Sequence, residues 1–309
     1  MIHSRAIVLP VMGILLAAAL ASAEKPPATD APPTGAGPKV LATVGKAEIT
    51  DAKVDAIISR YRGIKPDQVA AARKRILEQL IQRELTVAYL RTAPCPADKL
   101  AQTKQMLTEK LKPHKVTLEQ YLKRMGKTEA DLRLSVAMQT LQAEAASDEK
   151  ADALVKSSPP AYFDGTELNA SHILIMSPVY ASQPDRTSAR QKLAEIAKQI
   201  KAGDVTFEAA AKKHSACPSG KDGGALGKAF TFAVMDVGFS KAAFAMKVNE
   251  LSGIVPSSFG FHLIKVTKRT EGTGTPGSDA RKAARRMLLT ALQVDIIRKS
   301  AAANPVVIK

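Results

Sequence analysis

The chain has 309 residues, 45% of them hydrophobic, which is enough to bury a core and long enough for two domains. It contains no Trp and only 4% aromatic residues, so a surface that stacks sugars or single-stranded nucleic acid is not expected. The formal net charge of +16 favours acidic partners such as nucleic acid, anionic lipid or acidic unfolded chains. No zinc-finger, RNP or compact helix-turn-helix signature is present, so specific nucleic-acid binding is not predicted.

The first 23 residues have the pattern of a signal peptide. A cationic start precedes an apolar run over residues 6–20, and small residues precede the expected cleavage after Ala23. The apolar run is shorter than the roughly 20 residues that a membrane span needs. We therefore expect export, with a disordered linker rich in Pro, Gly and Ala over residues 24–39.

Residues 40–160 are expected to form a helical domain. A short pair of strands is predicted in "VLATVGKAEIT", with Gly45 at the turn, and the apolar spacing over Pro66–Thr92 predicts an amphipathic helix. Two capping boxes, Thr117–Gln120 and Thr128–Asp131, each predict the start of another helix. Consecutive prolines in "KSSPPAYFDG" predict the domain boundary.

Residues 165–270 have a mixed α/β pattern. The β-branched runs "ELNASHILIM" and "FGFHLIKVTKR" predict strands. Helices are expected between them over residues 187–202, where Gly203 is the stop signal, and over 206–214 and 237–246. Two arginines at the start of the first helix, Arg186 and Arg190, are interpreted as solvated.

The segment of residues 277–309 predicts a long basic helix over about 279–303. Its apolar residues share one face and need a partner, for which the helical region 40–158 is the expected one. These residues are Met287, Ala291, Val294, Ile297 and Ala301. The expected fold class is therefore α+β, with the mixed domain inserted into a helical domain that the C-terminal helix completes.

Two histidines, His172 and His262, lie in the two predicted strands. Alternation places each on one strand face with the apolar residues two and four positions later. If the strands are neighbours, the imidazoles can meet across the ladder. A pair of hydrogen-bonded core histidines without function is the alternative interpretation.

The turn-rich segment "HSACPSGKDGGALG" at residues 214–227 adds Cys217 to this pair. A zinc site formed by the two histidines and Cys217 is possible in ligand type, but no close ligand pair supports it. A Cys/His hydrolase has no local oxyanion signature here. A phosphate loop is excluded, because Asp222 and Ala229 stand where Gly and Ser or Thr are required. The other cysteine, Cys95, is not expected to form a disulfide with Cys217.

Residues 169–269 resemble the parvulin-type peptidyl-prolyl isomerase domain. The matches are "ASHILI" (170–175), "HSACPSGKDGGALG" (214–227), "MDVGFSKAAF" (235–244) and "LSGIVPSSFGFHLIKV" (251–266), in family order and spacing. The signal peptide, the helical region and the returning C-terminal helix resemble exported foldase-chaperones of the SurA and PrsA type. The resemblance implies a four-stranded antiparallel sheet with surrounding helices, inserted in an all-α chaperone domain.

The resemblance also implies the site residues. His172 and His262 correspond to the paired histidines, Ser257 to a hydroxyl that joins them, and Cys217 to a position where the family has Cys or Asp. The pocket for the proline ring is lined by three apolar residues, Leu226, Met235 and Phe239. No metal or cofactor is implied. The implied partners are unfolded exported polypeptides that contain X–Pro bonds, in the periplasm, and the charge allows a weak contact with an anionic membrane surface.

The chain departs from the family pattern at two places. Ala225 replaces the usual acidic residue of the glycine turn, and one extra residue lies between Gly227 and Met235, where an expected Gly is missing. These departures leave an alternative open: a non-catalytic holdase whose degenerate parvulin domain binds peptides.

Overall fold

The computed structural model describes residues 38–61 and 63–309, which belong to one compact unit, Pro38–Lys309. The predicted signal peptide, and the predicted linker up to residue 37, lie outside the described residues. Within the described part of the chain, no helix has the length and apolar character needed to cross a membrane. The predicted domain boundaries within the compact unit stay a prediction.

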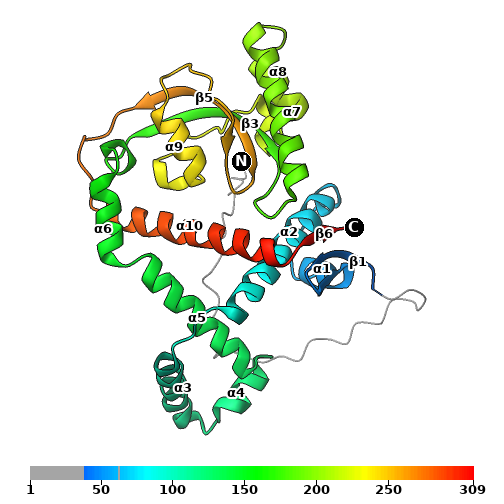
Figure 1. Cartoon of the computed structure of the whole chain (residues 1–309), viewed down its shortest axis with the longest axis vertical. Coiled ribbons are helices and arrows are strands. Elements are labelled where there is room, and N and C mark those ends of the chain that lie inside the picture. The colour runs from blue at the N-terminus through cyan, green and yellow to red at the C-terminus, as the bar shows by residue number, and fades with distance from the viewer. Residues whose placement is uncertain (1–37, 62) are drawn as a thin grey trace. The chain divides into compact units, whose positions relative to one another are not determined.

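The N-terminal part is mostly helical (Figure 1). Its helices are α1 (Asp51–Ile58), α2 (Pro66–Thr92), α3 (Ala97–Leu111), η1 (Lys112–His114), α4 (Leu118–Arg124), α5 (Glu129–Ala145) and α6 (Asp148–Ser157). Both predicted capping boxes are present: Thr117 and Gln120 exchange hydrogen bonds at the start of α4, and Thr128 and Asp131 do so at the start of α5.

The N-terminal part is not all-α, which corrects the expectation. Strands β1 (Val40–Val44) and β2 (Ala47–Thr50) form the predicted hairpin, whose turn holds Gly45 at a φ of 54°. A third strand, β6 (Val306–Ile308), pairs antiparallel with the free edge of β1. This short strand was not predicted, because three β-branched residues at the chain end have no alternation of their own and form a strand only on an available edge.

The mixed α/β part is built on the two predicted strands, β3 (Glu167–Met176) and β5 (Gly260–Thr270), which pair antiparallel over their whole length. The other elements of this part are η2 (Pro160–Tyr162), α7 (Gln183–Ala202), α8 (Phe207–His214), η3 (Pro218–Asp222), η4 (Phe232–Val234), α9 (Val237–Ala245) and β4 (Val255–Pro256). Helix α7 begins before the predicted start, because the Ser182 side chain caps it, and it ends as predicted at Gly203.

The sheet of this part has three regular strands in the order β3-β5-β4, not the four that the resemblance implied. The segment that would supply the fourth runs beside β3 and forms only isolated bridges with it, Leu168 to Phe230 and Ser171 to Ala225. Gly227, between the two bridges, and Gly224, directly before Ala225, have positive φ values, which turn the backbone out of strand geometry.

The two faces of the β3–β5 ladder contact different helices, as period-2 alternation requires (Figure 1). One face packs on α7 and α8 through apolar residues of both strands, Ile173, Ile175, Phe261 and Leu263. The opposite face packs on α9 and on η4 through another set, Leu168, Ala170, Ile264 and Val266. His172 and His262 share this parity with Ala170, Ile264 and Val266, so both histidines face α9.

The C-terminal helix α10 (Ala280–Ala303) contacts α2, α5 and α6, the helical region for which its apolar stripe was expected to need a partner. The ends of the stripe are buried at Met287 and Ile297, but Ala291 is exposed and Val294 half-buried. Ala284 and Met287 also belong to the core cluster that contains β3, β5 and α9. Helix α10 therefore shares one core with the mixed part of the chain.

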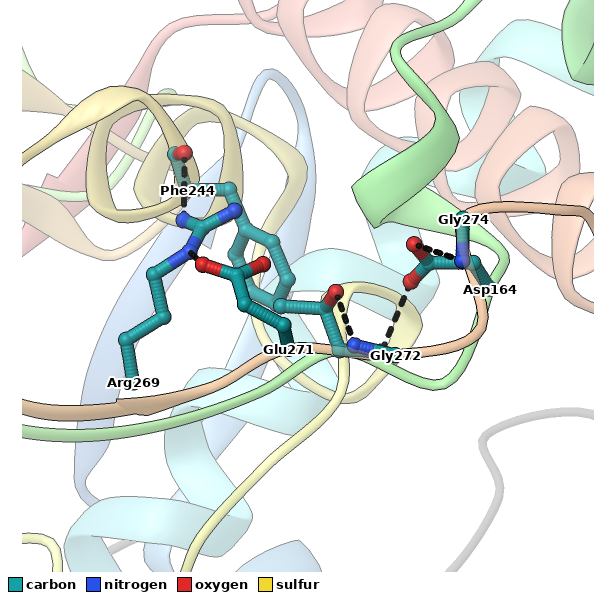
Figure 2. A network of polar contacts seen from close by, with 7 residues as sticks. Asp164, Phe244, Arg269, Glu271, Gly272 and Gly274 are labelled. Carbon is teal, nitrogen blue, oxygen red and sulfur yellow. Dashed lines mark hydrogen bonds and ion pairs between the residues drawn. The ribbon is translucent and has the colours of Figure 1, made fainter.

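The segment that leads into β3 and the segment that follows β5 are hydrogen-bonded to each other (Figure 2). The buried Asp164 carboxylate accepts hydrogen bonds from Thr166 N and Gly274 N, and Thr166 Oγ1 accepts one from Gly272 N. Nearby, Arg269 donates from Nη1 to Phe244 O and from Nε to the Glu271 carboxylate. Although burial acts to raise it, hydrogen bonds from Thr166 and Gly274 hold the pKa of Asp164 below its usual 3.8.

Gly272 is the tightest point of this junction. A Cβ atom there would lie 2.4 Å from Asp164 O and 2.6 Å from Thr166 N, both backbone atoms that cannot move aside. We expect Gly272→Ala to lower the free energy of unfolding by about 1–3 kcal/mol, since overpacking has this cost. Chemical denaturation measures the change. Gly253→Ala is the matched control, because a Cβ there meets nothing within 4 Å, and an equal loss in both variants would contradict the packing argument.

Candidate functional site

The two predicted histidines meet in the structure. The β3–β5 register places His172 opposite Ile264 and His262 opposite Leu174, so the histidines are diagonal neighbours on one face. Their rings stack with centroids 5.2 Å apart at an angle of 14°, and the two Nδ1 atoms are 3.0 Å apart. One Nδ1 therefore donates a hydrogen bond to the other.

Ser257 extends this pair into a chain of three polar side chains. Its Oγ lies 2.7 Å from His262 Nε2 and accepts a hydrogen bond from Phe259 N at 3.1 Å. If the Ser257 hydroxyl donates to His262 Nε2, then His262 Nδ1 donates to His172 Nδ1, and His172 Nε2 carries the remaining proton. The reverse order of donors satisfies the same contacts, with the hydroxyl directed to Gly260 O at 3.4 Å.

The imidazoles are buried, with 6% exposure for His172 and 4% for His262. Burial lowers the pKa of His172 to about 4. Burial, and next the neighbouring His172, lower the pKa of His262 to about 4, while the Asp236 carboxylate opposes this shift. Both rings are therefore neutral near pH 7. His172 Nε2 is buried and has no hydrogen-bond partner among the described residues, so the chain of polar side chains ends in an unsatisfied atom there.

The three predicted pocket residues lie on the apolar side of the pair. The buried Phe239 ring makes edge-on (T-shaped) contacts with both imidazoles. Its centroid lies 5.6 Å from that of His172 and 5.3 Å from that of His262. Leu226 and Met235 are half-buried and pack against the same core cluster as Phe239. The arrangement combines a neutral polar chain with an apolar wall. Phe244 and Phe261, predicted as core, are buried.

Cys217 lies on a segment that docks beside His262. Ser215 Oγ accepts hydrogen bonds from Leu174 N and Cys217 N, and Ala216 N donates to Leu174 O. The Cys217 thiol itself is half-buried and forms no hydrogen bond within the described part of the chain. Both cysteines are free. Among residues 38–61 and 63–309, no three His, Cys, Asp or Glu side chains are grouped so that they could hold a metal ion.

The glycines of the 214–227 segment bring its backbone against β3. His172 N donates to Gly224 O at 2.9 Å, and a Cβ atom at Gly224 would lie 2.5 Å from His172 O. Gly224 also has a φ of 87°, so both the space and the backbone angle require glycine. Ala225, next in the chain, is exposed, and the following Leu226 N still donates to Ala170 O. The change at Ala225 therefore leaves the backbone docking intact.

Arg186 is not the solvated side chain that the sequence suggested. It is half-buried, and its Nη1 donates to Ser177 O and Pro178 O. Its guanidinium lies 5.0 Å from the centroid of the Phe261 ring, a cation–π distance. Two backbone carbonyls and an aromatic face explain the burial, and neither could be anticipated from a helix-start pattern. Arg190 is exposed as predicted.

A cavity of about 410 Å³ adjoins the polar chain. Ser257, Ser258 and Asp236 line one side of it, and Ala291 and Val294 of α10 line the other. The two incompletely buried residues of the α10 stripe, Ala291 and Val294, therefore face this cavity. None of the three predicted proline-pocket residues lines it.

The sequence argument missed Asp236, which is hydrogen-bonded to the start of α9 and to the turn that carries Ser257. Its position could have been found, because an Asp immediately before a predicted helix is a capping signal. Its second contact, with Ser258, is made across 22 positions of sequence, and no local pattern predicts it.

Residues 172–268 match the family model described as Rotamase, PPIC-type PPIASE domain. The curated relative Chaperone SurA of Salmonella choleraesuis is 41% identical over 128 residues, which are 40% of this chain and 28% of that protein. Chaperone SurA of Escherichia coli O157:H7 is 40% identical over the same shares. The chain thus spans less than a third of the length of these relatives.

Among solved structures, a peptidylprolyl isomerase (PrsA) from Bacillus anthracis is 20% identical and overlays with a TM-score of 0.41. The overlay covers 73% of this chain and 96% of that one. A PpiC-type peptidyl-prolyl cis-trans isomerase domain is 22% identical, with a TM-score of 0.32, and covers 35% of this chain and 95% of that one.

The lowered pKa values of His172 and His262 predict how stability depends on pH. Between the ordinary value of 6.5 and about 4, the unfolded chain binds protons that the folded chain does not. The free energy of unfolding should therefore decrease as the pH falls from 6.5 to about 4, by a few kcal/mol at most. Denaturant titrations at several pH values measure this dependence.

The control is the double variant His172→Gln/His262→Gln, which removes both titrating groups. Its stability should depend less on pH across the same range. The dependence that remains comes from His214, whose pKa burial and the neighbouring Lys213 and Lys192 lower, because Asp164 acts only below pH 3.8. Equal pH dependence in both proteins would contradict the assignment, and imidazole NMR titration of the unmodified chain provides an independent check.

Proposed function

We propose that this chain, which carries a PPIC-type parvulin domain over residues 172–268, is a peptidyl-prolyl cis-trans isomerase that also acts as a chaperone for unfolded exported polypeptides. The observation that carries the proposal is the buried, neutral chain His172–His262–Ser257 with the Phe239 ring against both imidazoles. The relatives named Chaperone SurA support the chaperone half.

The reaction sets modest chemical demands. Rotation about a peptide bond crosses a barrier of about 18–20 kcal/mol, because the conjugation of the bond must be lost. Uncatalysed X–Pro exchange therefore takes roughly 10–100 s. No bond breaks, so the protein needs only to bind the twisted imide more tightly than either planar form, and each 1.36 kcal/mol gives about tenfold in rate.

The site residues have distinct roles in this reaction. Leu226 and Met235, half-buried against the core cluster that contains Phe239, hold the proline ring in an apolar environment. Removing water from the preceding carbonyl disfavours the polar planar form of the imide. The neutral histidine pair with Ser257 supplies a fixed hydrogen-bonding wall that does not need to reorganise during the rotation.

The thiol of Cys217 acts as a polar wall and not as a nucleophile. A cysteine nucleophile needs a base within hydrogen-bond reach, and this thiol has no hydrogen-bond partner in the described residues. Both histidines nearby direct Nδ1 to one another, so neither Nδ1 is available as a base.

The helical part and the basic surface provide the client-binding half of the proposal. Most client affinity comes from the helical part, and the net charge of +16 adds attraction for acidic segments and a weak contact with anionic membrane surfaces. Specific nucleic-acid binding has no part in it. We place the activity in the periplasm, which rests on the signal-peptide pattern and on the resemblance to exported foldases.

A non-catalytic holdase is the weaker interpretation. A degenerate isomerase site should have lost part of its polar chain or its backbone docking, and here both are intact despite Ala225. No sequence departure falls on the predicted pocket residues or on either histidine.

Truncation of the apolar wall should slow isomerisation without abolishing client binding. We expect Met235→Ala and Leu226→Ala in the full chain each to lower kcat/KM for an X–Pro peptide by about tenfold or more, since each removes contacts with the proline ring. Proline exchange NMR measures the rate. The full chain is used because α10 shares the core of the mixed part.

A matched control is Val248→Ala, which truncates an exposed apolar residue that is not one of the site residues and should leave the rate unchanged. Suppression of aggregation of an unfolded client should persist in all three variants. Absence of any acceleration by the folded unmodified chain, with aggregation still suppressed, would reject the enzyme and leave the holdase.

The role of Cys217 is tested by Cys217→Asp. We expect the variant to retain at least about a tenth of the isomerase activity, because an electrostatic role needs a polar group and not a thiolate. Cys217→Ala is the comparison that removes polarity altogether. Complete loss of activity in a correctly folded Cys217→Asp variant would favour nucleophilic attack instead.

A further inference from the structure

Among the carboxylates of the described residues, only Asp236 is hydrogen-bonded to both halves of the proposed site. Its Oδ1 accepts from Gly238 N at 2.8 Å and from Phe239 N at 3.5 Å, which caps α9. Its Oδ2 accepts from Ser258 N at 3.1 Å and from Ser258 Oγ at 2.7 Å. Four donors thus converge on a carboxylate that has no cationic partner among the ion pairs of the described residues.

The two elements that Asp236 joins carry different parts of the site. On one side, Met235 precedes the carboxylate and Phe239 lies in the first turn of α9, so both apolar residues depend on how this helix begins. On the other side, Ser258 neighbours Ser257, whose hydroxyl contacts His262. Charge-assisted hydrogen bonds of this kind are among the stronger polar contacts in proteins.

Little else fixes the turn over residues 257–259 relative to α9. Strand β4 has only two residues. The turn's backbone hydrogen bonds lead to Gly260 at the start of β5 and to Ser177 and Val179 in the loop after β3, and none leads to α9. The start of α9 lies close to β4, because a Cβ atom at Gly238 would be 2.4 Å from Pro256 O. This close approach brings the capping carboxylate within reach of Ser258, so one side chain spans the gap.

We propose that Asp236 is a positioning residue of the isomerase site, whose carboxylate holds the Ser257 turn against the first turn of α9. It thereby sets where the Ser257 hydroxyl and His262 stand relative to Met235 and Phe239. The proposal rests on the proposed function, since it concerns the same site. It adds a residue outside the histidine pair, the hydroxyl and the proline pocket.

The negative charge of Asp236 also reaches His262. It acts to raise the pKa of that imidazole, against burial and His172. Arg186 of α7 lines the same cavity as Asp236, but it stacks on Phe261, whose side chain points to the opposite face of the sheet. The titration of His262 therefore reports on the charge of Asp236, and a residue that only capped the helix would not shift it.

The test compares three variants of the full chain: Asp236→Asn, Ser258→Ala and the double variant. Asp236→Asn should lower kcat between about 10-fold and about 100-fold with little change in KM, because a displaced wall loses transition-state contacts while the apolar pocket still binds. Ser258→Ala, which leaves the helix cap intact, should lower kcat by a smaller factor. In the double variant the Ser258 change should add almost nothing, because both act through one contact.

Imidazole NMR gives the second readout. Asp236→Asn should shift the titration of His262 to lower pH, because the favourable negative charge is removed. Asp204→Asn is the matched control: it removes the same charge from an exposed position after α7 and should change neither kcat nor the titration.

A folded Asp236→Asn variant with unchanged kcat and an unchanged His262 titration would overturn the proposal, as would additive losses in the double variant. If Asp236→Asn does not fold, Ser258→Ala alone decides, and wild-type kcat would then reject the role. If the unmodified chain does not accelerate exchange, the proposed function fails. The His262 titration, and its hydrogen bond to Ser257, would then still show whether Asp236 positions the turn.

Discussion

The hydrogen bond between His172 Nδ1 and His262 Nδ1 constrains the rest of the site. Only one proton fits between two nitrogens 3.0 Å apart, so the pair is either neutral or carries an unfavourable buried charge. Burial decides for the neutral form near pH 7, as the pKa values of about 4 indicate. The donors and acceptors of the chain then follow one of two opposite orders between Ser257 and His172, with one proton on each imidazole. The last nitrogen, His172 Nε2, remains buried and unpartnered, which costs about 1–3 kcal/mol unless a ligand or water supplies the contact. An unpartnered buried nitrogen at this position is consistent with a functional role for His172.

The geometry of that hydrogen bond depends on several close backbone approaches. The antiparallel register makes the histidines diagonal neighbours on the face toward α9. Two glycines allow backbone contacts that a side chain would prevent. Gly224 lies against His172 O, and a Cβ atom at Gly260 would lie 2.2 Å from Ile175 O. Phe239 then closes the apolar side, and its ring reaches both imidazoles because Asp236 fixes the first turn of α9. The polar chain and the apolar wall are therefore positioned by the same few contacts.

The features that could be predicted from the sequence are those that depend on residues close together in the chain. The helix over Pro66–Thr92, both capping boxes and the strand Glu167–Met176 depend on residues a few positions apart, and the structure has them at the predicted places. The meeting of His172 and His262 followed from alternation and an antiparallel pairing. The irregular fourth strand, β6 and the burial of Arg186 depend on backbone edges, carbonyls and an aromatic face supplied from elsewhere in the chain. Asp236 combines both cases, with a local cap that the sequence indicates and a distant contact with Ser258 that it does not.

The mixed part of the chain does not pack independently of the helical part. Its core cluster includes Ala151 of α6 and Ala280, Ala284 and Met287 of α10, all buried. Tyr180, in the loop after β3, is buried in the cluster formed by β1, β2 and α2, where burial and Glu78 raise its pKa to about 12. The same loop donates from Val179 N to Ser258 O, and so it contacts the turn that carries Ser257. Because these contacts connect the helical part to the turn next to His262, a change in how the helical part packs alters the support of the polar chain. Residues 177–180 and 257–259 are therefore the contacts through which the packing of the helical part reaches the polar chain.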